Sequence, residues 1–182
     1  IEMNANMMQR IIGDFLDFHA MEDGQLTLNL QPANLNVVAS EVVEANRDYA
    51  ESKGIQIEFV SGGDLPFVSA DPARIQQVIQ NLVGNAIKFC GEGSQVWVKT
   101  RASQDRVFVE IQDTGPGLTE EDVQQAFQKY TKLSNKPTGG ESSSGLGLAI
   151  SKQLIDMHKG EIGVCTGPDG GALFWFSLLA SL

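Results

Sequence analysis

Three polar side chains at helical spacing are the first candidates for chemistry. Asn81, Asn85 and Lys88 recur at steps of four and three residues, so a helix places them on one side. Asparagine is a mediocre helix former, and two of them in mid-helix cost stability, as functional sites often do. A lysine can bind a nucleotide together with backbone amides and a magnesium ion. For this helix alone, an ordinary solvated polar stripe remains the alternative interpretation.

Two glycine-bearing loops flank this stripe in the sequence. Asp113 ends a predicted strand, and Gly115 and Gly117 allow the backbone there to approach a ligand closely. Gly145 and Gly147 lie at the N-terminus of a predicted helix, whose free N–H groups and dipole favour an anion. A glycine loop alone is weak evidence, so the combination has to carry the prediction.

The helix that presents the asparagines is well delimited. Asp71 is a favourable N-cap and Pro72 is tolerated at the first helical position, so a helix is predicted from here to about Phe89. Its apolar residues recur at three- and four-residue steps, which predicts one face packed on a core. These residues are Ile75, Val78, Ile79, Leu82, Ala86 and Phe89.

Helices and strands alternate along the rest of the chain. Strands are predicted over residues 26–30, 55–60, 96–100, 106–112, 161–166 and 172–179. Helices are predicted over residues 1–22, 34–53 and 144–160, and a short helix is predicted after Thr119, with Asp122 at near-capping-box spacing. The inward residues of the helix from Asn34 to Lys53 are predicted to be Leu35, Val38, Val42, Ala45 and Tyr49. Residues 131–144 are polar and predict a mobile surface loop.

This order predicts a two-layer α/β (α+β) sandwich, a mixed sheet with helices on one face, preceded by one amphipathic helix. The first helix carries Met3, Met7, Ile11, Phe15 and Phe18 on one side. A helix this apolar needs a partner, so it is interpreted as half of a helical hairpin. Because the sequence starts at Ile1, the chain is expected to be a fragment of a larger protein.

Composition narrows the classes of partner. The 182 residues carry 23 acidic and 13 basic side chains, a formal net charge of -10, without a Lys/Arg cluster. Nucleic acid and anionic membranes need a basic face, so neither is an expected partner. Two cysteines, Cys90 and Cys165, are too few for a disulfide framework and predict a reduced, cytoplasmic location. No apolar run approaches the roughly 20 residues of a membrane span.

The polar segments form an ordered set that strongly resembles the N, G1, F and G2 boxes of sensor histidine kinases, members of the GHKL ATP-binding superfamily with its Bergerat fold. The matching positions are Asn81, Asn85 and Lys88, then Asp113, Gly115 and Gly117, then Phe127 and Tyr130, then Gly145, Gly147 and Leu148. The resemblance covers about residues 26–180. Residues 1–23 resemble, less specifically, the second helix of the family's dimerisation and histidine-phosphotransfer domain, so the catalytic domain is expected over 24–182.

The resemblance implies ATP and Mg²⁺ as cofactors. Asn85 would ligate the magnesium, Asn81 would support the site and Lys88 would reach the phosphates. Asp113, with Gly115 and Gly117 beside it, would accept a hydrogen bond from the adenine amino group.

The remaining boxes would complete the nucleotide site. Gly145, Leu146 and Gly147 would offer amides to the phosphates, with Leu148 in the same segment, and residues 131–144 would form the ATP lid. Phe127 and Tyr130 would anchor the lid, although both could equally be core. Lys132 is a possible phosphate contact or a solvated lid charge.

Some residues depart from the family pattern. Cys90 stands where a Thr or Ser is usual and Lys159 where a second glycine is common, and neither is expected to touch the chemistry. His158, at the end of a predicted helix, is interpreted as a capping residue favoured by the helix dipole.

The resemblance also separates kinase from hydrolase. Gyrase-type and chaperone-type relatives carry a general-base glutamate where this chain has Asn81, and a carboxamide cannot take a proton from water. Transfer to a neutral histidine needs no such base. The family's acceptor histidine is followed by an acidic residue, and neither His19 nor His158 fits, so this fragment is not expected to phosphorylate itself.

The expected function is therefore phosphoryl transfer from ATP to a histidine on a helix outside this fragment, in a protein that serves a response regulator and is a homodimer in full length. The parent could be membrane-bound. The alternative is an ATP-binding module that senses nucleotide or docks a partner without transfer. An adaptor role without nucleotide would leave Asn81, Asn85 and Asp113 unexplained.

Overall fold

The fold is built on one five-stranded sheet. The computed structural model describes residues 12–13, 15–16, 18–141, 144–168 and 170–181. Across the sheet the strands follow the order β2 (Gln56–Val60), β4 (Gln95–Ser103), β5 (Arg106–Asp113), β7 (Ala172–Leu179) and β6 (Glu161–Thr166). β2 runs parallel to β4, and the other neighbours are antiparallel. The sheet is therefore mixed, as predicted.

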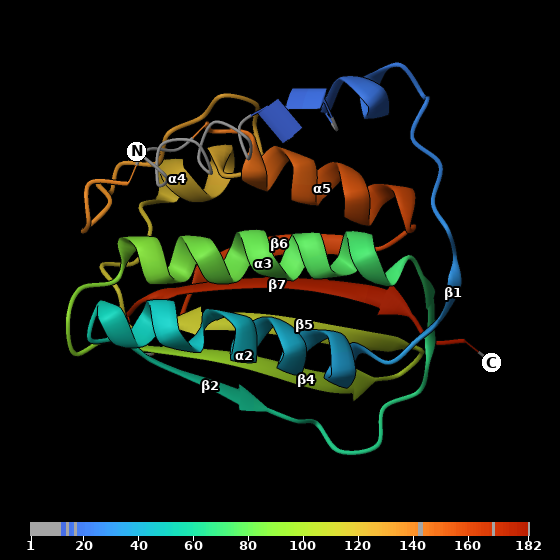
Figure 1. The fold of residues 1–182 in the computed structure, drawn as a ribbon, viewed down its shortest axis with the longest axis horizontal. Helices are drawn as coiled ribbons and strands as arrows, with labels where there is room; N and C mark the ends of the chain where they lie inside the picture. Colours follow the sequence, from blue (N-terminus) through green and yellow to red (C-terminus); the bar gives the residue numbers. More distant parts are fainter. Residues whose placement is uncertain (1–11, 14, 17, 142–143, 169, 182) are drawn as a thin grey trace.

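Three helices cover one face of this sheet (Figure 1): α2 (Leu35–Ser52), α3 (Pro72–Phe89) and α5 (Gly147–Met157). A fourth, shorter helix, α4 (Glu120–Gln125), follows β5 in sequence. The buried apolar side chains of the helices and of the facing sheet surface form one hydrophobic core. The two-layer sandwich with helices on one face is thus confirmed.

The central helix α3 forms as its sequence predicts. An Asp71 side-chain oxygen accepts from the Arg74 backbone N–H at 3.2 Å, Pro72 occupies the first turn, and the helix ends before Cys90. Its inward face is buried, including Ile75, Val78, Ile79, Leu82 and Ala86. This burial fixes the rotation of the helix and hence the direction of its polar side.

The predicted strand over residues 26–30 is wrong. Among the described residues this segment forms no strand, and a short strand β1 (Gln31–Ala33) follows it, paired with β3 (Val68–Ala70) in a separate two-stranded sheet. Leu30 is 53% exposed, and the Asn29 backbone N–H donates to an Asp71 side-chain oxygen at 2.9 Å. The alternating leucines therefore reflect partial cover of an extended segment, which periodicity alone cannot distinguish from sheet pairing.

Helix α2 has the predicted ends and a slightly different inward face. Asn34 caps its start by accepting from the Asn36 N–H, and Gly54 beyond its end has a φ of 67°. Ala45 and Tyr49 were predicted to face inward and are exposed, Tyr49 by 42%, whereas Asn46 and Ala50 are buried. In the C-terminal half of α2, each buried position therefore lies one residue after the predicted one. The prediction failed there because a polar residue, Asn46, was not expected in the core.

The helical residues between 12 and 22 lie before the sandwich. Phe18 and Met21 are buried in the core, while Ile12, Phe15 and Leu16 are exposed. The predicted positions Met3, Met7 and Ile11 lie outside the described residues. No helix in the described part of the chain is both long and apolar enough to span a bilayer.

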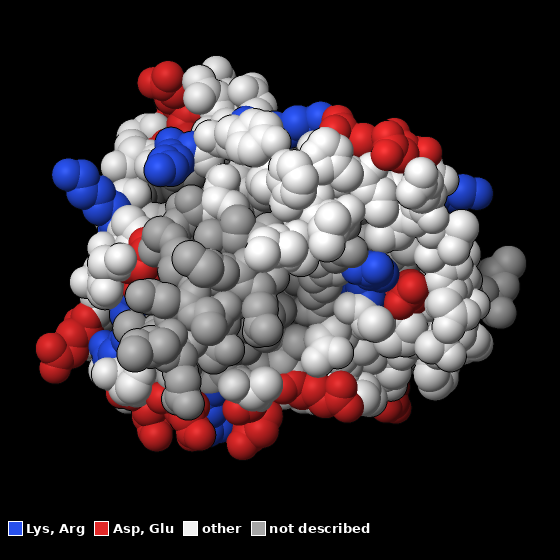
Figure 2. Space-filling view, turned by 45° about the horizontal axis from the view of Figure 1, so that its top comes forward, with Lys and Arg blue, Asp and Glu red and all other residues white. Residues whose placement is uncertain are grey.

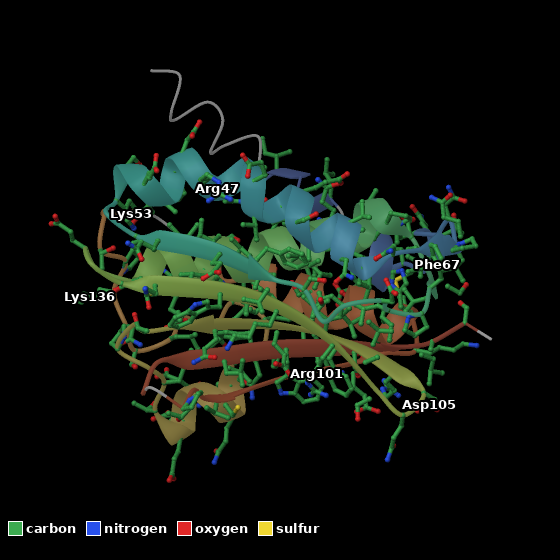
Figure 3. All side chains as sticks on the ribbon, turned by 90° about the horizontal axis from the view of Figure 1, so that it is seen from below. Arg47, Lys53, Phe67, Arg101, Asp105 and Lys136 are labelled. Carbon is green, nitrogen blue, oxygen red and sulfur yellow. The ribbon has the colours of Figure 1, made fainter. Side chains whose placement is uncertain are left out.

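The molecule has two distinct ends. Lys53, at the C-terminal end of α2, and Lys136, in the loop before α5, lie at one end, whereas Asp105 and Phe67 lie at the other (Figure 3). On the face drawn in Figure 2, acidic side chains gather along the lower edge and basic ones are scattered. The cleft described next opens at the end marked by Lys53 and Lys136.

Candidate functional site

A cavity of about 490 Å³ lies between α3, the loop that precedes α5, and the start of α5. We call residues 131–144 the lid loop; positions 142 and 143 lie outside the described residues. The cavity falls in the size range of small-molecule sites. Seven predicted site residues line it: Asn81, Asn85, Lys88, Lys132, Gly145, Gly147 and Leu148.

A second, small cavity of about 30 Å³ continues the first toward the sheet. Asp113 and Gly117 line it together with apolar side chains such as Phe174. Four residues line both cavities: Asn85, Phe89, Leu133 and Asn135. The two cavities thus form one cleft, with a carboxylate in an apolar slot at one end and the helix α5 N-terminus at the other.

Asp113 is held rigidly at the end of β5. Its side chain is buried, with 6% exposure, and Oδ1 accepts from the Gly115 N–H at 2.8 Å and the Ala172 N–H at 3.2 Å. Burial raises the pKa of Asp113, and these two amides and the Cys90 thiol oppose that rise. With Oδ1 occupied by amides, Oδ2 is the atom best placed to accept from a ligand.

The turn between β6 and β7 supports Asp113 by close backbone approach. A Cβ on Gly171 would lie 1.9 Å from the Asp113 carbonyl oxygen, so only glycine fits there. Gly117, at a φ of 73°, faces the Gly170 carbonyl in the same way, its would-be Cβ at 2.5 Å. Sequence analysis placed Gly170 and Gly171 only between two predicted strands and missed this role, although adjacent glycines were the available signal.

Cys90 does contact the site, contrary to the expectation from sequence. Its thiol forms a hydrogen bond with the Asp113 carboxyl group, and burial, reinforced by the charge of Asp113, raises the pKa of Cys90 to about 12. The group is therefore a thiol rather than a thiolate at neutral pH, and it can donate to the carboxylate. Cys90, which follows the last turn of α3, thus contacts Asp113 at the end of β5, because α3 and β5 meet at the slot.

The first part of the lid loop is tied to α4 and to the loop after β5. Asp122, the third residue of the Thr119 capping box, accepts from the Ser134 backbone N–H at 2.8 Å and the Ser134 hydroxyl at 2.5 Å. Burial would raise the pKa of Asp122, but these bonds and those from Thr119 outweigh it and lower the pKa to about 2. Asn135 Nδ2 also donates to the Gly117 carbonyl oxygen at 2.6 Å.

The second part of the lid loop is tied to α2 and α3. Thr138 donates through its N–H to the Lys88 carbonyl at 3.0 Å and through its hydroxyl to the Cys90 carbonyl at 2.8 Å. Glu141 accepts from Lys53 Nζ at 2.7 Å and Tyr49 Oη at 2.8 Å. Burial alone would raise the pKa of Glu141, but Lys53 and Tyr49 lower it to about 2. The exposed Tyr49 thus serves the lid loop rather than the core.

Four predicted site residues, all within the described part of the chain, line neither cavity: Gly115, Phe127, Tyr130 and Leu146. Phe127 packs at the core edge with its ring centre 6.5 Å from that of Phe174. Tyr130 is 62% exposed with a φ of 58°, and its N–H donates to the Gly145 carbonyl at 3.1 Å. The contribution of Tyr130 to the lid is therefore through its backbone, and the ring is not core.

His158 caps α5 through hydrogen bonds of its ring. Nε2 accepts from the Asp71 N–H at 3.0 Å, so Nδ1 carries the proton and donates to the Leu154 carbonyl at 2.7 Å. A ring that accepts at one nitrogen is neutral, so a charged, dipole-favoured cap is not what the structure has. The bond also joins the end of α5 to the start of α3.

Sequence reasoning missed a link between α2 and α3 at the cleft wall. The Asn46 and Gln80 carboxamides form two hydrogen bonds to each other, at 2.8 and 2.9 Å, and both residues line the larger cavity. Asn46 is buried, and its Nδ2 also donates to the Val42 carbonyl. The paired amides saturate each other, which allows polar groups at the wall without an unsatisfied donor.

The carboxamide oxygens along the cleft are suitable ligands for a magnesium ion that is bound together with phosphate groups. Asn81 and Asn85 bring carboxamides to the wall. Within the described residues, no group of three or more His, Cys, Asp or Glu could hold a metal without other help. Mg²⁺ prefers oxygen ligands and commonly combines few protein ligands with substrate phosphates and water. The residues fit such an ion better than one held by protein alone.

Comparison with known proteins agrees with this geometry. Residues 70–181 match the family described as histidine kinase-, DNA gyrase B-, and HSP90-like ATPase. The chain is 37% identical to the sensor protein GacS of Pseudomonas syringae pv. syringae over 186 residues, which cover 98% of this chain and 20% of GacS. It therefore spans only a small part of that relative.

Solved structures share the fold. Full-length ShkA in complex with AMPPNP superposes with a TM-score of 0.85 at 30% identity, covering 98% of this chain and 37% of ShkA. The catalytic domain of histidine kinase ThkA gives a TM-score of 0.74 at 28% identity, covering 84% of this chain and 97% of that domain. The chain belongs to the family of histidine kinase-, DNA gyrase B- and HSP90-like ATPases, and the relatives that it resembles include sensor histidine kinases.

Proposed function

We propose that this chain binds ATP with Mg²⁺ and provides the catalytic domain that transfers the γ-phosphoryl group to a histidine on a separate helix. The observation that carries the proposal is the order of groups along one cleft. Asp113 lies in an apolar slot at one end, Asn85 lies between the two cavities, and Gly147 opens α5 at the other end. An adenine base would meet Asp113, a magnesium ion would meet Asn85, and phosphate groups would meet the helix N-terminus at Gly147.

Each end of the cleft has a distinct task. The Asp113 carboxylate can accept from the amino group of adenine, while Phe174 and the other apolar walls of the slot exclude water from the base. Lys88 lines the wider part, where an ammonium group can contact phosphate oxygens. When bound, magnesium would neutralise charge on the phosphates, and Asn85, with Asn81 in support, would be its protein ligand.

The side chains favour transfer over hydrolysis. Asn81 cannot act as a general base toward water. Among the described residues that line the larger cavity, Glu141 is the one carboxylate, and Lys53 and Tyr49 already occupy it. Its pKa of about 2 makes it a poor proton acceptor. A neutral imidazole brought to the cleft needs no base, so it is the better nucleophile for this site.

The acceptor histidine is proposed to lie outside this chain. Both ring nitrogens of His158 are used in hydrogen bonds within the protein. His19 is exposed, and its ring stacks edge-on against Phe15, with centres 4.4 Å apart. No carboxylate follows either histidine in sequence. We therefore propose that the fragment binds ATP and does not phosphorylate itself.

The domain boundaries and partners follow from the same proposal. Residues 24–182 would form the ATP-binding domain and residues 1–23 the end of the phosphotransfer hairpin. The exposed Ile12, Phe15 and Leu16 support a helical partner there, since such side chains commonly pack against other helices. In the full-length protein this would be a homodimer that passes phosphate to a response regulator.

Calorimetric titration of this chain with ATP, with and without magnesium, tests the proposal. We expect binding that magnesium strengthens and that Asn85→Ala and Asp113→Asn each weaken at least tenfold. Asn36 is half-buried, lines neither cavity, and hydrogen-bonds Gly63 and Thr100, so Asn36→Ala provides a control. Transfer is then tested by adding the parent's histidine-bearing segment with labelled ATP. Absence of ATP binding by the unaltered chain would refute the nucleotide site, and label on His19 or His158 would refute the external acceptor.

A further inference from the structure

A buried serine links the first asparagine of α3 to the start of α5. Ser151 is 0% exposed, and its hydroxyl donates to the Gly147 carbonyl one turn earlier at 2.9 Å. Asn81 Nδ2 donates to the same carbonyl at 3.3 Å and to Ser151 Oγ at 3.4 Å. The three polar groups close a small triangle where α3 and α5 meet, beside the cleft.

This triangle determines which way the Asn81 carboxamide points. A backbone carbonyl only accepts, so the atom of Asn81 that faces Gly147 has to be the nitrogen. The Ser151 hydroxyl gives its hydrogen to Gly147, which leaves its lone pairs free to accept from Nδ2. Because Nδ2, Ser151 Oγ and the Gly147 oxygen form a nearly equilateral triangle, one carboxamide hydrogen is shared between the two acceptors on α5, and no hydrogen bond from the described residues reaches Asn81 Oδ1.

We propose that Ser151 is a positioning residue that keeps Nδ2 of Asn81 turned toward α5, so that Oδ1 stays available to the cleft as an acceptor. An acceptor attracts a cation or the water bound to it and repels phosphate oxygens. Ser151 thereby sets the polarity that Asn81 presents to the nucleotide. The inference deepens the proposed function and rests on it, since it concerns the metal-linked part of ATP binding.

Replacement of the serine should release the carboxamide. In Ser151→Ala, the shared hydrogen keeps the Gly147 carbonyl, 3.3 Å away, as its only acceptor on α5, so the carboxamide is held less firmly and Oδ1 no longer has one fixed direction. Partners that orient a metal ligand typically contribute about tenfold or more to metal affinity when they are removed. We expect the factor by which magnesium strengthens ATP binding to fall about tenfold, while ATP affinity without magnesium stays as in the unaltered chain.

Calorimetry with and without magnesium makes this measurement, and Ser40→Ala is the matched control. Ser40 also donates its hydroxyl to a helix carbonyl, that of Val37 at 2.9 Å, but lies on the exposed side of α2. In an Asn81→Ala background, Ser151→Ala should change the magnesium factor little further, because the group that it positions is gone. If Ser151→Ala does not fold, Ser151→Cys replaces the hydroxyl by a weaker hydrogen-bonding group of similar size.

A second readout needs no nucleotide or metal. In ¹H–¹⁵N spectra of the free protein, the Asn81 carboxamide protons should exchange slowly with water, and Ser151→Ala should speed their exchange. Equal losses of affinity with and without magnesium, an unchanged magnesium factor, or unchanged Asn81 signals would each overturn the positioning role. Failure of the unaltered chain to bind ATP would instead refute the proposed function and leave the spectroscopic test intact.

Discussion

Asn135 of the lid loop donates from Nδ2 to the carbonyl oxygen of Gly117, 2.6 Å away, and so crosses the slot that holds Asp113. Leu133 and Asn135 both line this slot, whose volume is about 30 Å³. That volume is about a tenth of the roughly 300 Å³ at which small-molecule pockets begin, so the slot as it stands does not admit a purine. The lid loop therefore has to move before a base can enter beside Asp113.

The first prediction concerns this contact. Asn135→Ala removes the bond to Gly117 and should open the slot more often, because an exchange of hydrogen-bond partners is no longer needed. We expect the association rate of ATP to rise roughly threefold to tenfold, the factor that a hydrogen bond of about 1 kcal/mol allows. Stopped-flow fluorescence with a labelled ATP analogue measures it, with Asn36→Ala as control. An unchanged association rate would show that this contact does not limit entry.

The second prediction concerns the stability cost of Asp113. Because burial raises its pKa, the folded state holds this proton more tightly than the unfolded state does. The unfolding free energy therefore falls as pH rises from the ordinary carboxyl range through the raised pKa. Asp113→Asn keeps an oxygen acceptor for the Gly115 and Ala172 amides without the charge. At neutral pH it should melt at a higher temperature than the unaltered chain, and the difference should vanish at low pH.

Thermal melts of both proteins between pH 3 and 8 make this comparison. Glu110→Gln, an exchange in a partly exposed ion pair with Arg101, provides a control for the removal of a negative charge. A melting difference that does not depend on pH would exclude the buried charge as its cause.

The third prediction concerns the contact between the lid loop and α2. Glu141→Gln weakens the bonds to Lys53 and Tyr49 and should loosen the lid loop, which carries a trypsin site after Lys132. We expect cleavage there to become several-fold faster at neutral pH. Because the pKa of Glu141 is lowered to about 2, the unaltered chain should lose this contact only as pH falls from the ordinary glutamate range toward 2.

Mass spectrometry of the tryptic fragments gives the rate of cleavage after Lys132. Glu44→Gln, which removes an exposed ion pair with Arg47 on the same helix, is the matched control. Equal cleavage rates in the Glu141 and Glu44 variants would mean that the Lys53 contact does not restrain the loop.

The fourth prediction concerns the joint between α5 and α3. His158→Phe removes the acceptor for the Asp71 N–H and the donor to the Leu154 carbonyl. A backbone donor left without a partner costs about 1–3 kcal/mol, so the free energy of unfolding should fall by that order. Urea unfolding measures it. Replacement of the neighbouring exposed residue, Lys159→Gln, should have little effect, and equal stability of the two variants would contradict the role given to the ring.

Much of the fold could be predicted because local signals and packing agree. α3 carries its own cap, its own Pro at the first turn and an apolar stripe that the core buries from Ile75 to Ala86, whereas Phe89 lines the cleft. The strand over 26–30 failed because partial burial of Leu26 and Leu28 produces the same alternation as a half-buried strand, and sheet pairing depends on distant backbone. β1 and β3, of three residues each, are too short to leave a period.

The site could be predicted where residue type and spacing within one element decide it, and less well where elements meet. Asn81, Asn85 and Lys88 share the cleft because one helix places them there. The contacts of Cys90 with Asp113, of Ser151 with Asn81 and of Asn46 with Gln80 join different elements, so no spacing within the sequence signals them. Their positions became clear only once helices and sheet were packed together.

A hydrogen bond from the Tyr130 N–H to the Gly145 carbonyl closes the base of the lid loop. A loop whose two ends meet can change in length or composition at small entropic cost, since closure depends only weakly on the number of residues in between. Insertions between these two points would leave α3, α5 and the Asp113 slot where they are. Changes in the sequence of the loop can therefore alter the residence time of a nucleotide during evolution, while α3, α5 and the Asp113 slot stay unchanged.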